Sequence, residues 1–322
     1  MLHHLLSVSD LRRTELETIL DVANDIAENP MHYSRVASGK ILATLFFEPS
    51  TRTRLSFESA MLRLGGSVIG FSEASATSAS KGESAEDTAS TVSCYCDVMA
   101  VRHPKMFTPH KMAKAASVPV INAGDGANEH PTQTLTDLLT IKKRFGRLDH
   151  LTIGLCGDLK YGRTVHSLVK MLARYPGNRF VLIAPDELAM PAYIIEMFER
   201  EGAQYTVNPN LESAISDVNI LYMTRIQRER FENPADYDRL KGVYVLDCAK
   251  MALASSDMIV MHPLPRVDEI STDVDSDSRA WYFKQAQMGV YARMALIMHL
   301  LNLGTMPGEE IVYVASEKYK AG

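Results

Sequence analysis

The chain has 322 residues, of which 46% are hydrophobic and 23% are charged, and its formal net charge is -5. This length exceeds what one hydrophobic core usually serves, so we expect two domains. The acidic balance argues against a protein that binds duplex nucleic acid, since such a protein needs a basic face to neutralise phosphates.

Helix and strand patterns alternate along the first half of the chain. Ser9 and Asp10 are candidate caps for a helix whose apolar residues keep helical spacing as far as Pro30. The apolar run 40–47 is typical of a buried strand, and a polar turn follows it at 48–53. The other elements predicted in this half are a helix ending near 64, strands at 68–71, 97–101 and 118–122, and a helix at 132–145.

Residues 72–84 form a polar segment made almost wholly of Ser, Ala, Gly, Thr, Lys and Glu. The segment has no apolar periodicity. Polar stretches of this length inside a compact domain are usually mobile functional loops or linkers. We therefore expect either a mobile functional loop or a linker here.

A second series of elements begins after Gly146, where we place the domain boundary. Alternating strands and helices of this kind predict an α/β fold with two domains, each a mostly parallel sheet flanked by helices. The elements predicted here are strands at 151–157, 180–184, 220–223, 243–246 and 258–261, and helices at 164–175 and 282–303.

The segment Ser50-Thr51-Arg52-Thr53-Arg54 lies between a predicted strand and a helix start. Unpaired backbone N–H groups and the helix dipole make that junction a favourable anion site. Three hydroxyls and two guanidiniums in five residues suit a phosphate. The alternative is a helix N-cap with solvated arginines, but a cap needs one hydroxyl and leaves most of the segment unexplained.

Further polar residues follow other predicted strands. Arg102 comes directly after one, and ligands of α/β folds bind at the carboxyl ends of parallel strands. His130 precedes a helix that begins at Pro131, and Gln133, one turn inside, can bind an amide. Taken singly, a surface arginine is the commoner explanation of Arg102, and His130 suits a helix cap as well as a catalytic group.

In the second half of the chain, polar residues again follow predicted strands. Arg163 lies between a strand and a helix, Arg225 and Gln227 follow another strand, and the segment 262–266 (HPLPR) follows a third. Two prolines in a turn fix backbone carbonyls, which suits recognition of an amine. Scattered surface arginines would not prefer strand ends, so the joint pattern predicts one site for small anions.

The sequence contains no pattern typical of a metal or nucleotide site. Its four cysteines form no CxxC pair, no histidine pair has zinc-ligand spacing, and both GxGxxG and GxxxxGK[ST] are missing. No apolar run is long enough to span a membrane, and the N-terminus does not resemble a signal peptide. We expect no cofactor, no metal and a cytoplasmic location.

Six motifs stand in order along the chain: FFEPSTRTRLSFE, VMAVRHP, NAGDGANEHPTQTLTDL, GDLKYGRTVHSL, LYMTRIQRER and HPLPRVDEI. With them the chain resembles the catalytic chains of aspartate carbamoyltransferases from about Leu11 to about Leu303. The resemblance implies a carbamoyl-phosphate-binding domain of residues 1–145 plus 287–322 and an aspartate-binding domain of residues 146–286. It also implies that the C-terminal helix packs back on the first domain.

The implied activity is transfer of the carbamoyl group from carbamoyl phosphate to the amine of L-aspartate, a step of pyrimidine biosynthesis. The products are N-carbamoyl-L-aspartate and phosphate, and the reaction needs neither a covalent intermediate nor a metal. The family forms homotrimers with active sites shared between subunits, so the resemblance implies a homotrimer. Regulatory chains remain open as further partners.

The resemblance also implies roles for single residues. The phosphate of carbamoyl phosphate would be bound by Ser50, Thr51, Arg52 and Thr53. Its carbonyl oxygen would be polarised by Thr53, Arg102 and His130. Its nitrogen would be held by Gln133 and the backbone carbonyls of Pro263 and Leu264.

The aspartate carboxylates would be held by Arg163, Arg225 and Gln227. A lysine from the neighbouring subunit's loop, Lys81 here, would complete the site together with Ser78 or Ser80. Because donors aimed at the developing oxyanion need no reorganisation, we expect His130 to donate while neutral rather than act as a strong base.

The sequence disfavours three alternatives. Ornithine carbamoyltransferases are expected to show an HCLP-type motif, whereas this chain has HPLP, and Arg225 would repel the ornithine ammonium. A non-catalytic paralogue with the same fold is disfavoured because the matched functional positions are intact, apart from the ambiguous loop serine. An NAD-dependent oxidoreductase is disfavoured by the missing glycine fingerprint.

Overall fold

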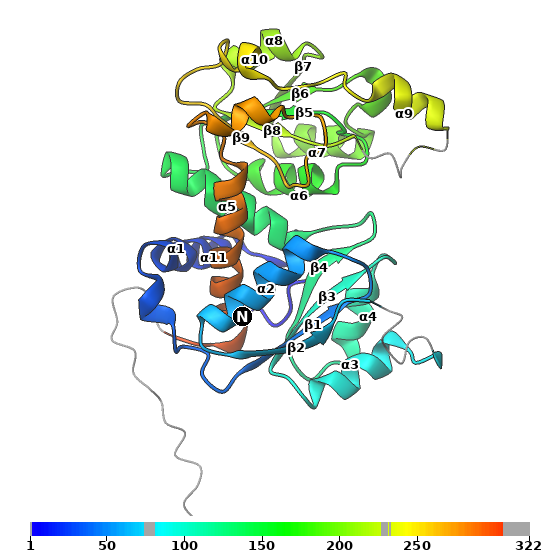
Figure 1. Ribbon diagram of the computed structural model, residues 1–322, viewed down its shortest axis with the longest axis vertical. Coiled ribbons are helices and arrows are strands. Elements are labelled where there is room, and N and C mark those ends of the chain that lie inside the picture. Colours follow the sequence, from blue (N-terminus) through cyan, green and yellow to red (C-terminus); the bar gives the residue numbers. More distant parts are fainter. Residues whose placement is uncertain (1, 74–80, 227–230, 232, 305–322) are drawn as a thin grey trace, which may run out of the picture.

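Two parallel β-sheets, one from each half of the chain, form the framework of the protein (Figure 1). The structure is a computed structural model that describes residues 2–73, 81–226, 231 and 233–304. The strand order is β2-β1-β3-β4 in the first sheet and β7-β6-β5-β8-β9 in the second, and neighbouring strands run parallel. The predicted α/β fold is confirmed.

The strands are short and mostly buried. In β1, Leu42 and Phe46 face the core shared with the helices between the sheets, whereas Ala43 and Leu45 face the core on the other side. Burial on both faces explains the continuous apolar run of the sequence. The strands are β1 (Ile41–Phe46), β2 (Ser67–Phe71), β3 (Val98–His103), β4 (Val120–Asp125), β5 (Thr152–Cys156), β6 (Arg179–Ile183), β7 (Gln204–Val207), β8 (Ile220–Met223) and β9 (Ile259–Met261).

Helices cover both sheets, and those described are α1 (Arg13–Glu28), α2 (Thr51–Arg63), α3 (Ala85–Ser93), α4 (Thr108–Ala115), α5 (Pro131–Phe145), α6 (Arg163–Leu172), α7 (Ala192–Glu201), α8 (Leu211–Ala214), α9 (Pro234–Leu240), α10 (Cys248–Met251) and α11 (Tyr282–Leu301). Among the residues described, no helix is both long and apolar enough to cross a membrane.

The C-terminal helix α11 connects the part of the protein around the first sheet to the part around the second sheet. It starts beside β9 and runs past α5 to α1 and α2, as Figure 1 shows. Its residues are buried nearly all round, as expected of a helix with packing partners on every side. The prediction that this helix packs back on the first domain is confirmed.

The helix α5 ends at Gly146, whose φ of 70° is the left-handed conformation that glycine adopts readily. The second sheet begins directly afterwards with β5. The assignment of residues 1–145 plus 287–322 to one domain and 146–286 to the other stays a prediction, and α11 itself crosses the boundary at 286.

Two local predictions are wrong. Ser9 and Asp10 do not cap the first long helix: Ser7 and Asp10 form a capping box on the short 3₁₀ helix Val8–Asp10, and α1 begins at Arg13. Residues 243–246 do not form a strand. Because β9 already occupies the neighbouring position beside β8, only Leu246 pairs, in an isolated bridge to Ile270.

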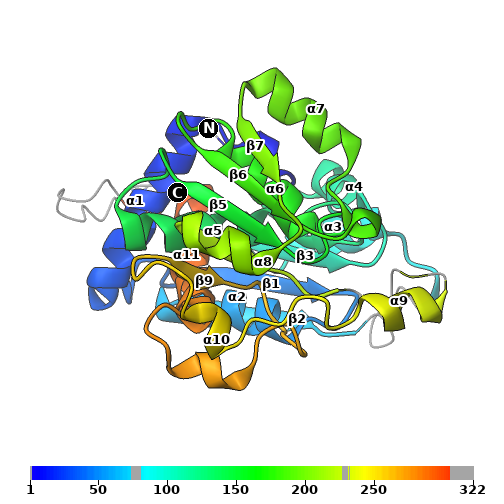
Figure 2. The same ribbon diagram turned by 90° about the horizontal axis from the view of Figure 1, so that it is seen from above.

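The strand β7 was not predicted. It lies at the edge of the second sheet beside β6, with α7 next to it (Figure 2). Its side chains are mostly exposed, so it lacks the apolar run that marks the central strands. Of the predicted loop at 72–84, residues 74–80 lie outside the described residues.

Candidate active site

A cleft of about 850 Å³ opens where the strand ends of the two sheets meet. Parallel strands deliver their carboxyl ends to one edge of a sheet, so the loops after β1, β3, β4, β5, β8 and β9 all reach this cleft. The predicted site residues that line it are Ser50, Arg52, Thr53, Arg102, His130, Gln133, Arg163, Arg225, Pro263 and Leu264.

The other four predicted site residues are not among the described residues that line the cleft. Thr51 is the exposed first residue of α2 and does not line the cleft. Lys81 is exposed and also lies away from the cleft of its own chain. Ser78 and Gln227 lie outside the described residues, as does the alternative Ser80.

Three helices begin at the cleft without a side-chain cap. They are α2, α5 and α6, whose N-cap residues Ser50, His130 and Gly162 all line the cleft. At the start of α2 the first-turn N–H groups therefore remain available to a ligand, whereas Pro131 of α5 has no N–H, and the N–H groups of Gln133 and Arg163 already donate to backbone carbonyls. Each helix dipole adds partial positive charge. The Ser50 side chain makes no capping hydrogen bond, which disfavours the alternative of a simple helix N-cap at 50–54.

Arginines from both sheets lie close to one another. Burial, followed by the charges of Arg102 and Arg225, lowers the pKa of Arg52. The Arg52 Nη2 donates to the backbone carbonyl of Leu264 at 3.0 Å, which joins the loop after β1 to the loop after β9. Arg163 Nη1 donates to the carbonyl of Gly126.

The position of Arg102 is set by its surroundings. Its Nε donates to Glu48 Oε1 at 2.5 Å, and its Nη1 donates to the Ala123 carbonyl at 3.3 Å. A Cβ added at Gly124 would lie 2.2 Å from Arg102 Nη1, so a side chain there would displace the guanidinium. Gly124 also has a φ of 116°, which only glycine adopts without strain.

His130 is buried between Thr53 of α2 and Thr132 of α5. Thr53 Oγ1 lies 3.4 Å from its Nε2, and Thr132 Oγ1 lies 3.4 Å from its Nδ1. Burial, followed by the charges of Arg102, Arg163 and Arg293, holds the pKa of His130 well below its ordinary value. The imidazole is therefore neutral at pH 7, and one ring nitrogen can donate to a substrate oxygen.

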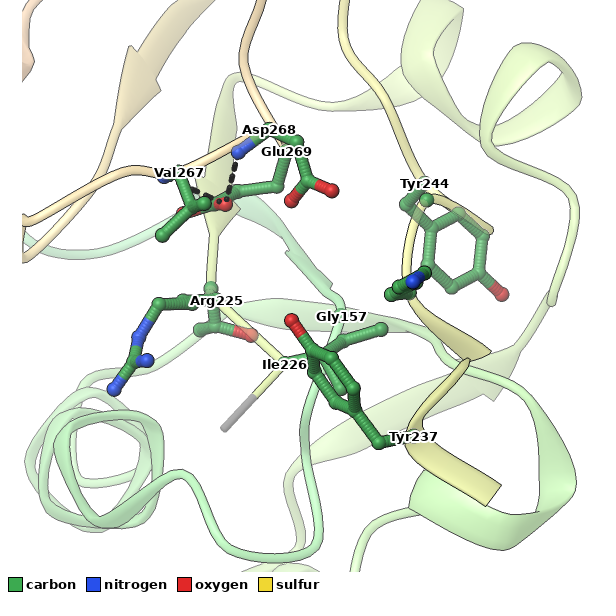
Figure 3. A pocket seen from close by; sticks show the side chains of 11 residues that line it. Gly157, Arg225, Ile226, Tyr237, Tyr244, Val267, Asp268 and Glu269 are labelled. Atoms are coloured by element: carbon green, nitrogen blue, oxygen red, sulfur yellow. Dashed lines mark hydrogen bonds between the residues drawn. The ribbon is translucent and has the colours of Figure 1, made fainter. Parts of the chain in front are cut away.

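The turn after β9 is held by a buried histidine and a buried glutamate. His262 Nδ1 accepts from the backbone N–H of Leu264 at 2.7 Å, so its Nε2 carries the proton that is donated to Glu269 Oε1 at 2.7 Å. The other Glu269 oxygen accepts from the N–H groups of Val267 and Asp268 at 3.0 and 3.2 Å (Figure 3). These contacts fix the carbonyls of the turn.

A small pocket lies next to the cleft, and Thr224 and Arg225 line both. Figure 3 shows the Arg225 guanidinium pointing away from the rings of Tyr237 and Tyr244, which line the small pocket. Arg225 follows β8 and adds its charge to the cleft.

Sequence analysis missed several residues at the cleft. Arg293 on α11 is buried beneath it, where Nη2 donates to Thr132 Oγ1 at 3.2 Å and Nη1 to Ser56 Oγ at 3.1 Å. Burial lowers the pKa of Arg293 to about 10. A charged residue inside the apolar run of α11 was the available signal. In the part of the chain described, no three His, Cys, Asp or Glu side chains could hold a metal ion.

The neutrality of His130 is testable without a substrate. The Cε1–H resonance of its ring, identified by its loss in His130→Asn, should keep one chemical shift between about pH 6 and 8, because the pKa lies below that window. The measurement is an NMR titration of the full chain. A shift change with a midpoint inside this window would contradict the electrostatic account of the cleft.

Comparisons with known proteins agree with this geometry. Residues 3–143 match the family model "Aspartate/ornithine carbamoyltransferase, carbamoyl-P binding domain". Residues 149–300 match "Aspartate/ornithine carbamoyltransferase, Asp/Orn binding domain". Together the two models cover both sheets and the cleft between them.

Relatives and solved structures give the same result. The chain is 58% identical to the aspartate carbamoyltransferase catalytic subunit of Lachnoclostridium phytofermentans, over 93% of this chain and 98% of that protein. The Clostridium perfringens protein of the same name is 59% identical, over 92% of this chain and 97% of that protein.

The catalytic subunit of M. jannaschii aspartate transcarbamoylase is similar to the structure with a TM-score of 0.88, 44% identity, and coverage of 93% and 98% of the two chains. Aspartate transcarbamoylase from Trypanosoma cruzi, solved with N-(phosphonacetyl)-L-aspartic acid, has a TM-score of 0.86, 40% identity, and coverage of 92% and 95%. The chain belongs to the aspartate/ornithine carbamoyltransferase family.

Proposed function

We propose that the protein is an aspartate carbamoyltransferase, which transfers the carbamoyl group of carbamoyl phosphate to the amine of L-aspartate and releases phosphate. The observation that carries this proposal is the single cleft lined by Arg52, Arg102, Arg163 and Arg225 from both sheets. Both substrates are anions that repel each other, and guanidiniums offset that repulsion by binding oxyanions through two hydrogen bonds. The relatives at 56–59% identity carry this name.

The phosphate is bound at the start of α2. Ser50 and Thr53 supply hydroxyls there, the uncapped first turn that begins at Thr51 supplies N–H groups, and Arg52 supplies the charge. In the described structure Arg52 donates to the Leu264 carbonyl. A phosphate oxygen carries more negative charge than a carbonyl, so we infer that Arg52 exchanges the carbonyl for the phosphate when the substrate arrives.

The reacting carbonyl group lies next to Thr53, Arg102 and His130. Attack by the aspartate amine on the carbonyl carbon places negative charge on its oxygen, and the bond to phosphate then breaks. Donors already held in position stabilise that charge without reorganising, and losing one typically costs about 3 kcal/mol. The departing phosphate is the proposed acceptor of the amine proton, since the neutral His130 is a poor base.

The amino group of the carbamoyl moiety is recognised by acceptors. These are the side-chain oxygen of Gln133 and the carbonyls of Pro263 and Leu264, which the contact between His262 and Glu269 holds in place. Release of the Leu264 carbonyl from Arg52 would leave it free to accept from the substrate.

Aspartate is held by Arg163, Arg225 and Gln227 on the side of the second sheet. A cationic residue at position 225 favours a carboxylate and opposes the ammonium of ornithine. Trypanosoma cruzi aspartate transcarbamoylase has been solved with carbamoyl phosphate and aspartate together. Closure of the two domains over both substrates would exclude water from the reacting groups.

We also propose a homotrimer whose neighbouring subunits share each site. The exposed Lys81 lies off the cleft of its own chain, which supports its delivery, with Ser78 or Ser80, to the neighbour. Regulatory chains remain open as partners. A cytoplasmic enzyme of pyrimidine biosynthesis, working without cofactor or metal, is the setting that fits this proposal.

Substrate choice is tested by phosphate release from carbamoyl phosphate with aspartate or ornithine as acceptor. We expect aspartate to react about a hundredfold faster or more, because Arg225 pairs with its carboxylate. Arg225→Gln should raise the KM for aspartate about tenfold or more, as for a lost charged hydrogen bond. Its control is Arg179→Gln, an exposed arginine at the opposite end of the same sheet. Faster release with ornithine would refute the assignment.

Sharing of sites is tested by mixing inactive variants. Arg52→Ala and Lys81→Ala chains should together regain about a quarter of the wild-type activity, because random assembly pairs an intact cleft with an intact neighbouring Lys81 in that share of sites. A mixture of Arg52→Ala with His130→Ala is the control and should stay inactive, since every cleft then carries a defect. Equal inactivity of both mixtures would show that each subunit works alone.

A further inference from the structure

We propose that Asp137 is a positioning residue that sets the direction of the Gln133 amide and the place of the turn after β9, and thereby selects an amino group on the substrate. The inference rests on the proposed function, and concerns a residue outside the cleft lining. Asp137 lies on α5, is fully buried, and is one turn behind Gln133.

The Asp137 carboxylate joins three elements. Its Oδ1 accepts from Gln133 Nε2 at 2.8 Å and from Gln285 Nε2 of α11 at 2.7 Å. Its Oδ2 accepts from the Tyr222 hydroxyl of β8 at 2.9 Å. One buried side chain of α5 is therefore hydrogen-bonded both to α11 and to β8, a central strand of the second sheet.

The direction of each amide follows from its other contacts. Gln285 Oε1 accepts from the backbone N–H of His262 at 2.8 Å, so its Nε2 must face Asp137. A backbone N–H can only donate, which makes this assignment independent of the charge on Asp137. Since Oδ1 accepts from Gln285, it also presents a lone pair to Gln133, whose Nε2 then faces the carboxylate.

The consequence for the cleft is chemical selectivity. With Nε2 of Gln133 held against Asp137, the amide oxygen faces away from the carboxylate, and an oxygen accepts from an –NH₂ group. Through Gln285, the same carboxylate also anchors His262, whose ring accepts from the Leu264 N–H. Asp137 thus supports both kinds of acceptor proposed for the carbamoyl nitrogen.

The second sheet is included in this arrangement through Tyr222. Tyr222 lies in β8, the strand that Arg225 follows, and its hydroxyl donates to Asp137 Oδ2. The carboxylate that orients the groups proposed to bind the carbamoyl nitrogen is therefore also bonded to the strand before a group proposed to bind aspartate. Buried polar groups joined in this way lose much of their stabilisation when one member is removed.

The test compares carbamoyl phosphate with acetyl phosphate, in which a methyl group replaces the –NH₂ group. The dissociation constants of both compounds and of inorganic phosphate are measured on the wild-type chain and on Asp137→Ala. We expect the wild type to prefer carbamoyl phosphate by about tenfold, and Asp137→Ala by about twofold, from hydrogen bonds lost to the amino group. The affinity for inorganic phosphate should stay unchanged.

The matched control is Asn178→Ala. Asn178 is buried in the second half of the chain and also makes three hydrogen bonds, to the Leu151 N–H and to the carbonyls of Leu148 and Leu172. Both variants lose a buried polar side chain with three hydrogen bonds, so both should lose stability. Only Asp137→Ala should lose the preference for the amino group.

Each outcome decides the matter. An Asp137→Ala protein that keeps the preference, or that loses affinity for all three ligands equally, would overturn the inference. If Asp137→Ala does not fold, Asp137→Leu replaces it, because leucine fills more of the vacated volume and offers no acceptor to Gln133 or Gln285, and a retained preference would again overturn the inference. A wild-type chain that binds neither acyl phosphate would overturn the proposed function instead, and the inference with it.

Discussion

The cleft depends on holding like charges close together. Arg52, Arg102 and Arg225 come from three different strand ends, and their mutual repulsion contributes to lowering the pKa of Arg52. Isolated in water, such groups would move apart. The two parallel sheets prevent this, because the carboxyl ends of their strands meet at one place and the loops after them have few alternative positions. The stored repulsion is relieved when anions bind.

Three carboxylates in and behind the cleft stabilise this arrangement. Glu48 accepts from Arg102, Glu269 accepts from His262, and Asp137 accepts from the two glutamine amides. Burial raises the pKa of Asp137 to about 7, against the opposing effect of its hydrogen bonds, which favour the ionised form. Each acceptor therefore holds a donor of the cleft in one direction. Sites that stabilise developing charge depend on such prior orientation.

Much of this could be predicted from the sequence, for identifiable reasons. The central strands are continuous apolar runs, and the basic residues follow them directly. The position at strand ends could therefore be predicted for Arg52, Arg102, Arg163 and Arg225. The cleft also brings His130 and Gln133 beside them, as the motif order implied. The features that could be predicted are those with a local pattern in the sequence.

The supporting residues could not be found in this way. Arg293 is unusual as a charged residue in the apolar run of α11, but nothing near it or Gln285 in the sequence indicates that this helix passes under the loops of the first sheet. The exposed edge strand β7 lacks an apolar run. These features depend on contacts between distant segments, and one chain without an alignment carries no local record of them.

The central claim is that charge converging on the start of α2 creates the anion site. It is tested most directly by titrating inorganic phosphate against Arg52→Gln and Arg63→Gln, which remove the same charge from the first and the last turn of one helix. We expect Arg52→Gln to weaken phosphate binding by about tenfold or more, and Arg63→Gln to leave it nearly unchanged. Equal affinities in the two variants would contradict the account.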